Sequence, residues 1–254
     1  MKTFTFVLDG RDIEAREGQT ILEAADAAGV YIPRLCHHEG LPPVGHCRLC
    51  SVKVNGKVAN ACTMPAAEWM VVETETEELT DHRRRIIELL FVEGNHFCPI
   101  CERSGNCELQ ALAYRFGMTA PTWPYLSRGA AVDASHPDLF VDRNRCILCG
   151  RCVRASRERD GKTVFGFEGR GMATRIALDS RAGLGASSME RDDAAASICP
   201  TGSLVVKRVG YSTPYGARAY DKAPIGTTVA EAAAVKPMAE KATTEKAVTG
   251  KKEG

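Results

Sequence analysis

The sequence predicts an α+β protein built from three small units and a polar tail, and three observations support this fold class. Apolar residues alternate around two short turns before residue 79, apolar residues recur at helical spacing after it, and a proline-containing crossing beyond residue 118 leads into a further unit. We therefore expect units at residues 1–78, 79–120 and 121–222, followed by a disordered tail at 223–254.

Two hairpins, one helix and a further strand are predicted in the first unit. FTFVLDGRDIEA alternates apolar residues on both sides of Asp9-Gly10, SVKVNGKVANA does so around Asn55-Gly56, and MVVETET is typical of a strand. Between the hairpins, Thr20 and Glu23 form a capping box for a helix that stops at Gly29 and whose apolar face is Ile21, Leu22, Ala25 and Ala28. These elements predict a small mixed sheet with one helix packed across it.

Two helices are predicted in the second unit. Thr80 is the expected cap of the first, which ends at Gly94-Asn95 and carries one apolar stripe, namely Ile86, Ile87, Leu90 and Phe91. The second helix ends at Gly117 and its stripe is Leu109, Leu112, Ala113 and Phe116. Both stripes are interpreted as core packing.

Prolines and turn residues between Thr119 and Asp138 indicate a linker-like crossing to the third unit, which begins with LFVDRNRCILCGRCVRAS.

Composition limits the function classes that fit this chain. The formal net charge is only +1, so there is no general electrostatic case for a nucleic-acid partner. Asp9 and Arg11 interrupt the apolar stretch that a signal peptide needs, and no run reaches the length of a membrane span, so we expect a cytoplasmic protein with no membrane partner. In a reducing compartment, the 11 cysteines indicate metal ligands rather than disulfides, and their odd number supports this.

The first cysteine set comprises Cys36, Cys47, Cys50 and Cys62, with the spacing C-x10-C-x2-C-x11-C. A lone thiol on either side of one close pair, in the glycine-containing loop PPVGHCRLC, favours a 2Fe-2S cluster over the two short knuckles usual for structural zinc. Cys36-x-His38 hints at a Rieske centre, but Cys47 and Cys50 do not supply its second histidine. His37 and His38 are therefore interpreted as loop residues near the cluster.

The third cysteine set comprises Cys146, Cys149, Cys152 and the distant Cys199. CILCGRC followed by a remote CP is the bacterial-ferredoxin pattern with one change, because Ser156 occupies the position of the cysteine that would ligate a second cluster. We therefore predict one 4Fe-4S cluster here, and prefer it to zinc because a CxxCxxC run brings three thiols around one compact cluster.

The second set lies in EGNHFCPICERSGNCELQ and lacks one thiol. Cys98, Cys101 and Cys107 are the three cysteines that the other sets leave over, whereas a third cluster needs four ligands. His96 is the nearest further donor, since an imidazole nitrogen is a competent iron ligand. We predict that His96 completes a second 4Fe-4S site; the alternative is that His96 caps the preceding helix end and that water, substrate or another group takes the fourth iron.

Other cofactor motifs are missing from the sequence. GLGASS and GFEGRG do not satisfy G-x-G-x-x-G, and there is no Walker loop or spare pair of CxxC motifs for a nickel-iron centre, so we expect no flavin, NAD or nickel in this chain and no catalytic residue. Such a chain would relay single electrons between partners that carry the substrate chemistry. Five arginines flank the ligand runs and are interpreted mainly as charge balance on a solvated or partner-facing surface, the alternative being that they raise cluster potentials: Arg48, Arg103, Arg145, Arg151 and Arg154.

The three sets in this order resemble the N-terminal part of the large iron-sulfur subunit of respiratory complex I and the region before the catalytic domain of iron-only hydrogenases. FVEGNHFCPICERSGNCELQALAY and KRVGYSTPYGARAY make the chain more similar to the small diaphorase subunit, of the HoxU type, of soluble NAD-reducing nickel-iron hydrogenases. The resemblance covers residues 1 to about 220. It implies a plant-type ferredoxin domain of β-grasp form, a small helical His-Cys domain and a bacterial-ferredoxin-like domain.

The resemblance also implies partners, namely a flavin-bearing NAD(H) subunit and the small and large hydrogenase subunits. In complex I and the iron-only hydrogenases the ligating histidine stands four residues before the first cysteine, where this chain has Gly94, whereas the hydrogenase subunits share the Asn-His pair found here. Two alternatives remain open at this point. One is the same relay in a formate dehydrogenase or a complex I-like enzyme; the other is a zinc-stapled interaction protein without a redox role.

Overall fold

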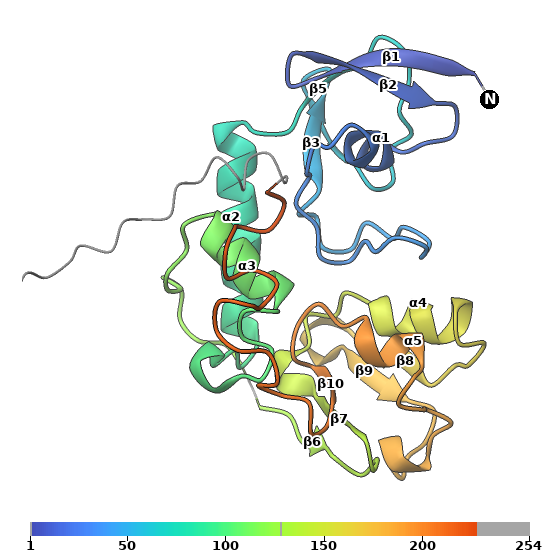
Figure 1. Ribbon diagram of the computed structural model, residues 1–254, viewed down its shortest axis with the longest axis vertical. Coiled ribbons are helices and arrows are strands. Elements are labelled where there is room, and N and C mark those ends of the chain that lie inside the picture. Colours follow the sequence, from blue (N-terminus) through green and yellow to red (C-terminus); the bar gives the residue numbers. More distant parts are fainter. Residues whose placement is uncertain (1, 128, 228–254) are drawn as a thin grey trace, which may run out of the picture.

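A computed structural model describes residues 2–127 and 129–227 of the chain and shows an α+β fold, the predicted class (Figure 1). A small sheet with its own helix lies at one end, two helices lie beside the middle, and a second group of short strands and helices lies at the other end. Within the described residues, no helix is both long enough and apolar enough to cross a membrane.

The first unit is a five-stranded mixed sheet in the order β2-β1-β5-β3-β4, in which β1 and β5 are parallel. Its core joins the inner face of the sheet to α1. Both predicted hairpins, the further strand and the capping box of Thr20 and Glu23 are confirmed. The elements are β1 Thr3–Leu8, β2 Arg11–Arg16, α1 Ile21–Ala27, β3 Ser51–Val54, β4 Lys57–Asn60 and β5 Val71–Glu73.

One predicted core position of α1 is wrong. Ala28 is the exposed C-terminal cap of the helix, and Ala24 is buried in its place. The reason is the short length of α1, because Ala28 already lies beyond the last helical residue and faces solvent at the turn into Gly29.

The second unit contains the helices α2 Glu77–Glu93 and α3 Glu108–Arg115, whose predicted apolar stripes pack together (Figure 1). The predicted cap Thr80 is wrong: Thr76 caps α2, and its side chain accepts a hydrogen bond from the Leu79 amide at 3.3 Å. Thr80 lies inside the first turn, where its own amide donates to the Thr76 carbonyl. Helix α2 therefore begins before the predicted boundary at residue 79.

The third unit combines two small sheets with short helices. Strand β7 lies between β10 and β6, and β8 pairs with β9, all antiparallel. The predicted crossing between Thr119 and Asp138 contains β6, so it contributes a strand as well as a link. The elements are β6 Val132–Asp133, β7 Leu139–Asp142, α4 Arg151–Glu158, β8 Phe165–Glu168, β9 Arg175–Leu178, α5 Ala194–Ser197 and β10 Leu204–Val206.

The C-terminal segment returns across the second unit. Of the predicted tail, residues 223–227 are described, and Ile225 packs into the core that includes α3. The Arg115 guanidinium also donates a hydrogen bond to the Ile225 carbonyl at 2.9 Å. The packed part of the chain therefore extends past residue 222, and the rest of the predicted tail, 228–254, lies outside the described residues.

Candidate iron-sulfur sites

The four thiols of the first set converge on the loop between α1 and β3 and on the end of β4. The amide of Cys36 donates to the Cys47 sulfur at 3.4 Å, and the amide of Cys47 donates to the Cys36 sulfur at 3.5 Å. A hydrogen bond from Cys47 lowers the pKa of the Cys36 thiol to about 6, and one from Cys50 lowers the pKa of Cys62. Amides turned toward sulfur, and thiols close enough to share protons, are what a thiolate-ligated cluster requires.

The third set surrounds an apolar hollow. Its walls include all four predicted cysteines together with Val141, Phe165, Ile176 and Leu204. Cys149 and Cys152 lie where the chain turns into α4, at Gly150 with a φ of +68°, while Cys199 comes from the end of α5. Burial raises the pKa of the Cys146 thiol to about 11 and of Cys149 to about 12, so iron binding there must displace protons.

Ser156 does not line the third set, in line with its predicted loss of ligand function. Its side chain is fully buried, donates to the Lys162 carbonyl at 3.2 Å and accepts from the Val164 amide at 3.2 Å. This hydroxyl therefore links the C-terminal part of α4 to the residues just before β8. The position that would hold a cysteine in a two-cluster ferredoxin has become part of the core.

The second set also surrounds a hollow, whose walls include His96, Cys98, Cys101 and Cys107. Cys98 and Cys101 bracket a short 3-10 turn, and Cys107 begins α3. The Nε2 atom of His96 is buried and has no hydrogen-bond partner among the described residues. The ring also hydrogen-bonds the Leu90 carbonyl in the last turn of α2, which leaves Nε2 as its free nitrogen. An unpartnered buried nitrogen beside three thiols fits an iron ligand, and the contact with Leu90 would orient the ring for that role.

Two surroundings of His96 favour its neutral form. Burial and the Arg145 guanidinium lower the pKa of the imidazole to about 4, although Asp142 acts in the opposite direction. A neutral ring keeps a lone pair for a metal. The ring also lies against Gly94, where an added Cβ would stand 2.4 Å from Nε2. His96 therefore fills the space that a side chain at position 94 would need.

The flanking arginines are less exposed than the solvated surface that we expected for them. Arg151 is 3% exposed and binds Glu108 through two contacts of 2.6 and 2.7 Å. Arg145 donates to the Cys101 sulfur at 3.6 Å and to Glu102 at 2.9 Å. The surface interpretation is therefore wrong for Arg151 and for Arg154, which is 6% exposed, while Arg48 is exposed as expected.

The third set borders both of the other sets. Arg154 of α4 donates to the Cys36 carbonyl at 2.5 Å and lies 3.4 Å from the Cys149 carbonyl oxygen. On the other side, a Cβ added to Gly202 would stand 3.1 Å from the Cys101 sulfur and 3.2 Å from Nη1 of Arg145. Sequence reasoning missed Gly202, although a glycine three residues after a predicted ligand was a visible signal of close backbone approach.

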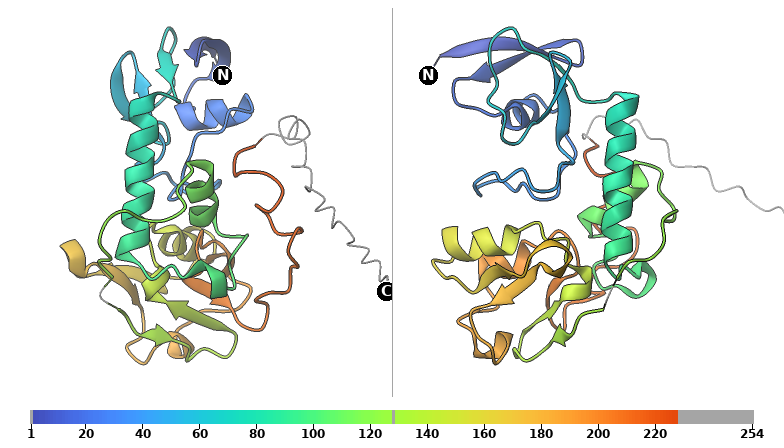
Figure 2. Two further views of the ribbon diagram at one scale, coloured as in Figure 1. Left: turned by 90° about the vertical axis from the view of Figure 1, so that its left-hand side faces the viewer. Right: turned by 180° about the vertical axis from the view of Figure 1, so that it is seen from behind.

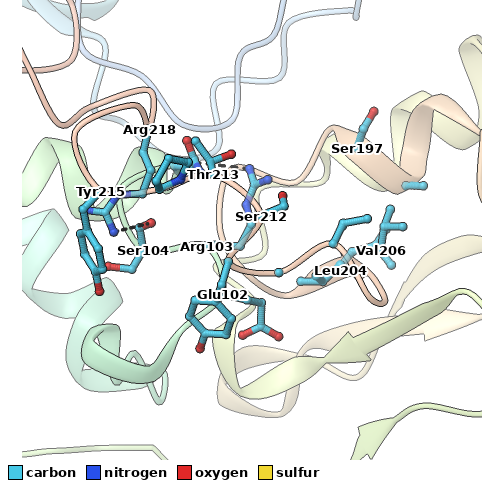
Figure 3. Close-up of a pocket in the computed structure, with 17 residues that line it drawn as sticks. Glu102, Arg103, Ser104, Ser197, Leu204, Val206, Ser212, Thr213, Tyr215 and Arg218 are labelled. Atoms are coloured by element: carbon cyan, nitrogen blue, oxygen red, sulfur yellow. Dashed lines mark hydrogen bonds between the residues drawn. The ribbon is translucent and has the colours of Figure 1, made fainter.

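A surface hollow of about 330 Å³ lies beside the second set (Figure 3). The C-terminal segment KRVGYSTPYGARAY forms one wall, and Glu102, Arg103 and Ser104 form another. Arg218 donates to the Ser104 carbonyl at 3.2 Å, and its guanidinium carbon lies 4.0 Å from the centre of the Tyr215 ring. The segment is thus fastened to the loop that carries Cys98 and Cys101.

Among the described residues, no three His, Cys, Asp or Glu side chains are grouped tightly enough for one metal ion.

Comparisons with known proteins match the three units separately. Residues 1–77 match a 2Fe-2S iron-sulfur cluster binding domain, residues 83–121 match the NADH-ubiquinone oxidoreductase-G iron-sulfur binding region, and residues 139–206 match a 4Fe-4S single cluster domain. The chain is 42% identical over 215 residues to the gamma subunit of the NAD-reducing hydrogenase HoxS of Cupriavidus necator, covering 84% of this chain and 92% of that protein. This chain belongs to that hydrogenase subunit family.

A solved structure supports the family assignment. A chain from the crystal structure of an NAD+-reducing nickel-iron hydrogenase in the H2-reduced state matches with a TM-score of 0.86 and 47% identity, over 90% of this chain and 98% of that one. The mitochondrial NADH-ubiquinone oxidoreductase 78 kDa subunit of Candida albicans is 34% identical over 84% of this chain, which spans only 29% of that longer protein. One 2Fe-2S and two 4Fe-4S clusters are therefore the cofactors of this hydrogenase subunit.

Proposed function

We propose that this chain is the iron-sulfur relay of an NAD-reducing hydrogenase, in which it carries electrons between a flavin-bearing NAD(H) subunit and the nickel-iron hydrogenase subunits. The observation that carries the proposal is the presence of three separate ligand sets in one chain that spans 92% of a hydrogenase gamma subunit. Iron-sulfur clusters supply one-electron transfer when bound. The described residues would contribute the cluster ligands, apolar side chains around the clusters and buried positive charge near them.

The hollows and contacts described above support the following residue assignments. The first set, Cys36, Cys47, Cys50 and Cys62, would hold the 2Fe-2S cluster in a β-grasp ferredoxin unit at 1–78. His96 with Cys98, Cys101 and Cys107 would hold one 4Fe-4S cluster in the helical unit at 79–120, and the third set would hold the other in the unit at 121–222. A cytoplasmic location is part of the same proposal.

The experiment that tests this function combines metal content with spectroscopy. We would purify the chain anaerobically, alone and with its partners, and measure iron, zinc and the low-temperature EPR of the reduced protein. The relay predicts roughly ten iron atoms per chain, two in the small cluster and four in each larger one. About six irons, or stoichiometric zinc in a colourless protein, would contradict the three-cluster relay.

A substitution of His96 in the same experiment tests whether this residue is a cluster ligand. Replacing His96 by Cys exchanges a neutral ligand for an anionic one, so the EPR signal of one 4Fe-4S cluster should change and its reduction potential should fall. His82 provides a matched control, because it lies exposed on α2 away from the three hollows, and His82→Cys should leave every signal as it is. An unchanged spectrum in His96→Cys would remove His96 from the ligand set.

Identifying the large subunit that copurifies distinguishes the hydrogenase from the alternative terminal enzymes. A nickel-containing partner supports the hydrogenase relay, and a molybdenum- or tungsten-containing partner supports a formate dehydrogenase. The family match at 42% identity over nearly the whole relative favours the first outcome. The flavin subunit should copurify in both cases and therefore does not discriminate between them.

A further inference from the structure

Arg83 is a buried cation whose side chain reaches from one unit into another. It belongs to α2, yet its guanidinium enters the first unit and donates three hydrogen bonds to backbone carbonyls there. Nε binds the Leu49 carbonyl at 3.0 Å, Nη2 binds that of Ser51 at 2.8 Å, and Nη1 binds that of Thr74 at 2.7 Å. The residue is only 1% exposed and is the largest of the fully buried side chains.

This cation lacks a carboxylate partner. Among the described residues no Asp or Glu forms an ion pair with Arg83, in contrast to Arg145 and Arg151, which each bind a carboxylate within 3.0 Å. Burial of an ion is expensive unless an opposite charge compensates it. Neutral carbonyls orient the guanidinium but do not cancel its charge. The carboxylates of Glu75 and Asp9 favour the charged form without forming an ion pair with it.

The position of Cys50 indicates a further source of negative charge beside Arg83. Leu49 and Ser51, two of the three residues whose carbonyls bind Arg83, are the immediate neighbours of Cys50 in the chain. Cys50 is itself 1% exposed and belongs to the first set. A 2Fe-2S cluster with four thiolates is negative in both of its oxidation states, because thiolates and sulfides together outweigh the iron charge. Arg83 therefore lies directly behind a ligand of an anionic group.

We propose that Arg83 is the counter-charge of the 2Fe-2S cluster and a positioning residue for electron relay, which raises the reduction potential of that cluster. The reduced cluster carries one more negative charge than the oxidised one, so a nearby cation stabilises the reduced form more. Because Arg83 is buried, solvent and salt screen this effect weakly. The inference rests on the proposed function, since it requires the first set to hold its cluster.

A purely structural role makes different predictions from the electrostatic one. If Arg83 only ties Leu49, Ser51 and Thr74 together, its replacement lowers stability and leaves the cluster potential in place. Replacement by lysine separates the two roles. Lysine keeps the positive charge, but it cannot donate hydrogen bonds to the three carbonyls in the planar geometry of a guanidinium. Glutamine removes the charge and keeps some hydrogen-bonding capacity.

The test is an EPR-monitored redox titration of the full complex carrying Arg83→Gln or Arg83→Lys. At a fixed ambient potential, we expect the ratio of reduced to oxidised 2Fe-2S cluster in Arg83→Gln to fall about tenfold, equivalent to a midpoint lowered by about 59 mV for one electron. Arg83→Lys should stay closer to wild type than to Arg83→Gln. The 4Fe-4S signals of the same sample serve as internal references.

Arg84→Gln is the matched control. Arg84 is the next residue on α2, is exposed, and donates to the Phe116 carbonyl at 2.7 Å on the side of the second unit. Its replacement should leave the 2Fe-2S midpoint unchanged. If Arg83→Gln loses the cluster but Arg83→Lys retains it, the charge requirement is supported directly.

Three outcomes overturn the proposal. They are an unchanged midpoint in Arg83→Gln, equal midpoints in the Gln and Lys variants that differ from wild type, and loss of the cluster from both variants. A wild-type complex without a 2Fe-2S signal would instead refute the proposed function, so the two failures can be told apart.

Discussion

At the residue scale, glycines decide how closely the ligand sets approach their surroundings. Gly94 leaves room for the His96 ring, and Gly202 lets the third unit approach the second set. The space that a side chain at position 94 would need is thus occupied by the ring of a residue two places later. This arrangement brings the His96 ring to the hollow that Cys98, Cys101 and Cys107 line.

Gly202→Ala is expected to perturb the second set without replacing any of its proposed ligands. The new methyl would meet the Cys101 sulfur at 3.1 Å and the Arg103 Cγ and Arg145 Nη1 atoms at 3.2 Å. Overpacking of this kind costs about 1–3 kcal/mol. We expect a lower thermal midpoint and a changed EPR signal of one 4Fe-4S cluster.

Gly166→Ala is the control for that measurement. Gly166 lies in β8, and an added Cβ there meets nothing within 4 Å. Its spectrum and thermal midpoint should match those of the wild-type protein or show slight stabilisation. A Gly202→Ala protein that behaves like Gly166→Ala would show that the second set tolerates the extra methyl.

Cysteine spacing predicted the ligand candidates, whereas burial of the arginines could not be predicted from spacing. Counting thiols singled out His96, and the structure places it beside the three cysteines of the second set. The role of Arg83 was missed, although a signal existed: Leu79, Arg83 and Ile87 recur every four residues and share one helical face. A charged residue on such a face indicates a buried, partnered cation.

At the element scale, the start of α2 distinguishes two threonines that are four residues apart in the sequence. Thr76→Ala should destabilise the protein by about 1 kcal/mol, because the Thr76 side chain accepts a hydrogen bond from the Leu79 amide. Thr80→Ala is the matched control and should cost less, since Thr80 caps nothing. Hydrogen exchange of the first turn of α2 checks both variants, and equal exchange in the two would contradict the cap assignment.

Tertiary contacts explain why the sequence did not locate this cap. TETEELT offers several threonines ahead of the helix, and their capping preferences are alike. A contact of Thr74 distinguishes the threonines. The Thr74 amide donates a hydrogen bond to the Asp9 carboxylate at 2.7 Å, so β5 ends just before Thr74 and α2 starts soon after it. By contrast, the hairpins were predicted correctly because Asp9-Gly10 and Asn55-Gly56 specify their turns locally.

At the scale of the whole molecule, two ion pairs join the second unit to the third, Arg145 with Glu102 and the more deeply buried Arg151 with Glu108. Arg151 is almost fully buried and is bound by both oxygens of Glu108. Glu108→Gln would leave its buried charge unpaired, so we expect a loss of about 3 kcal/mol. Chemical denaturation followed by cluster absorbance measures this loss.

A double variant checks that the loss arises from the stranded charge. Arg151→Met in the Glu108→Gln background removes that charge, and it should recover part of the stability. No recovery would mean that Glu108 acts through contacts other than Arg151. The exposed pair of Arg85 and Asp81 is the control, because its removal should change stability by less than about 1 kcal/mol.

The arrangement of the units is the part that the sequence could not supply. Arg154 binds the Cys36 carbonyl across 118 residues of chain, and no local pattern encodes such a contact. Turn chemistry and helical periodicity act over a few residues, whereas docking depends on shapes that exist only after each unit has folded. The sequence therefore predicted what each unit holds but not which units touch.

Arg83 also determines how this protein can be divided. The first unit obtains three of its backbone hydrogen bonds from a side chain that lies five residues beyond its predicted end at residue 78. A ferredoxin fragment cut at that point would expose three carbonyls in its own interior. The smallest transplantable electron carrier in this chain therefore includes α2 at least as far as Arg83, and a cut at residue 78 would separate the first unit from a side chain that it needs.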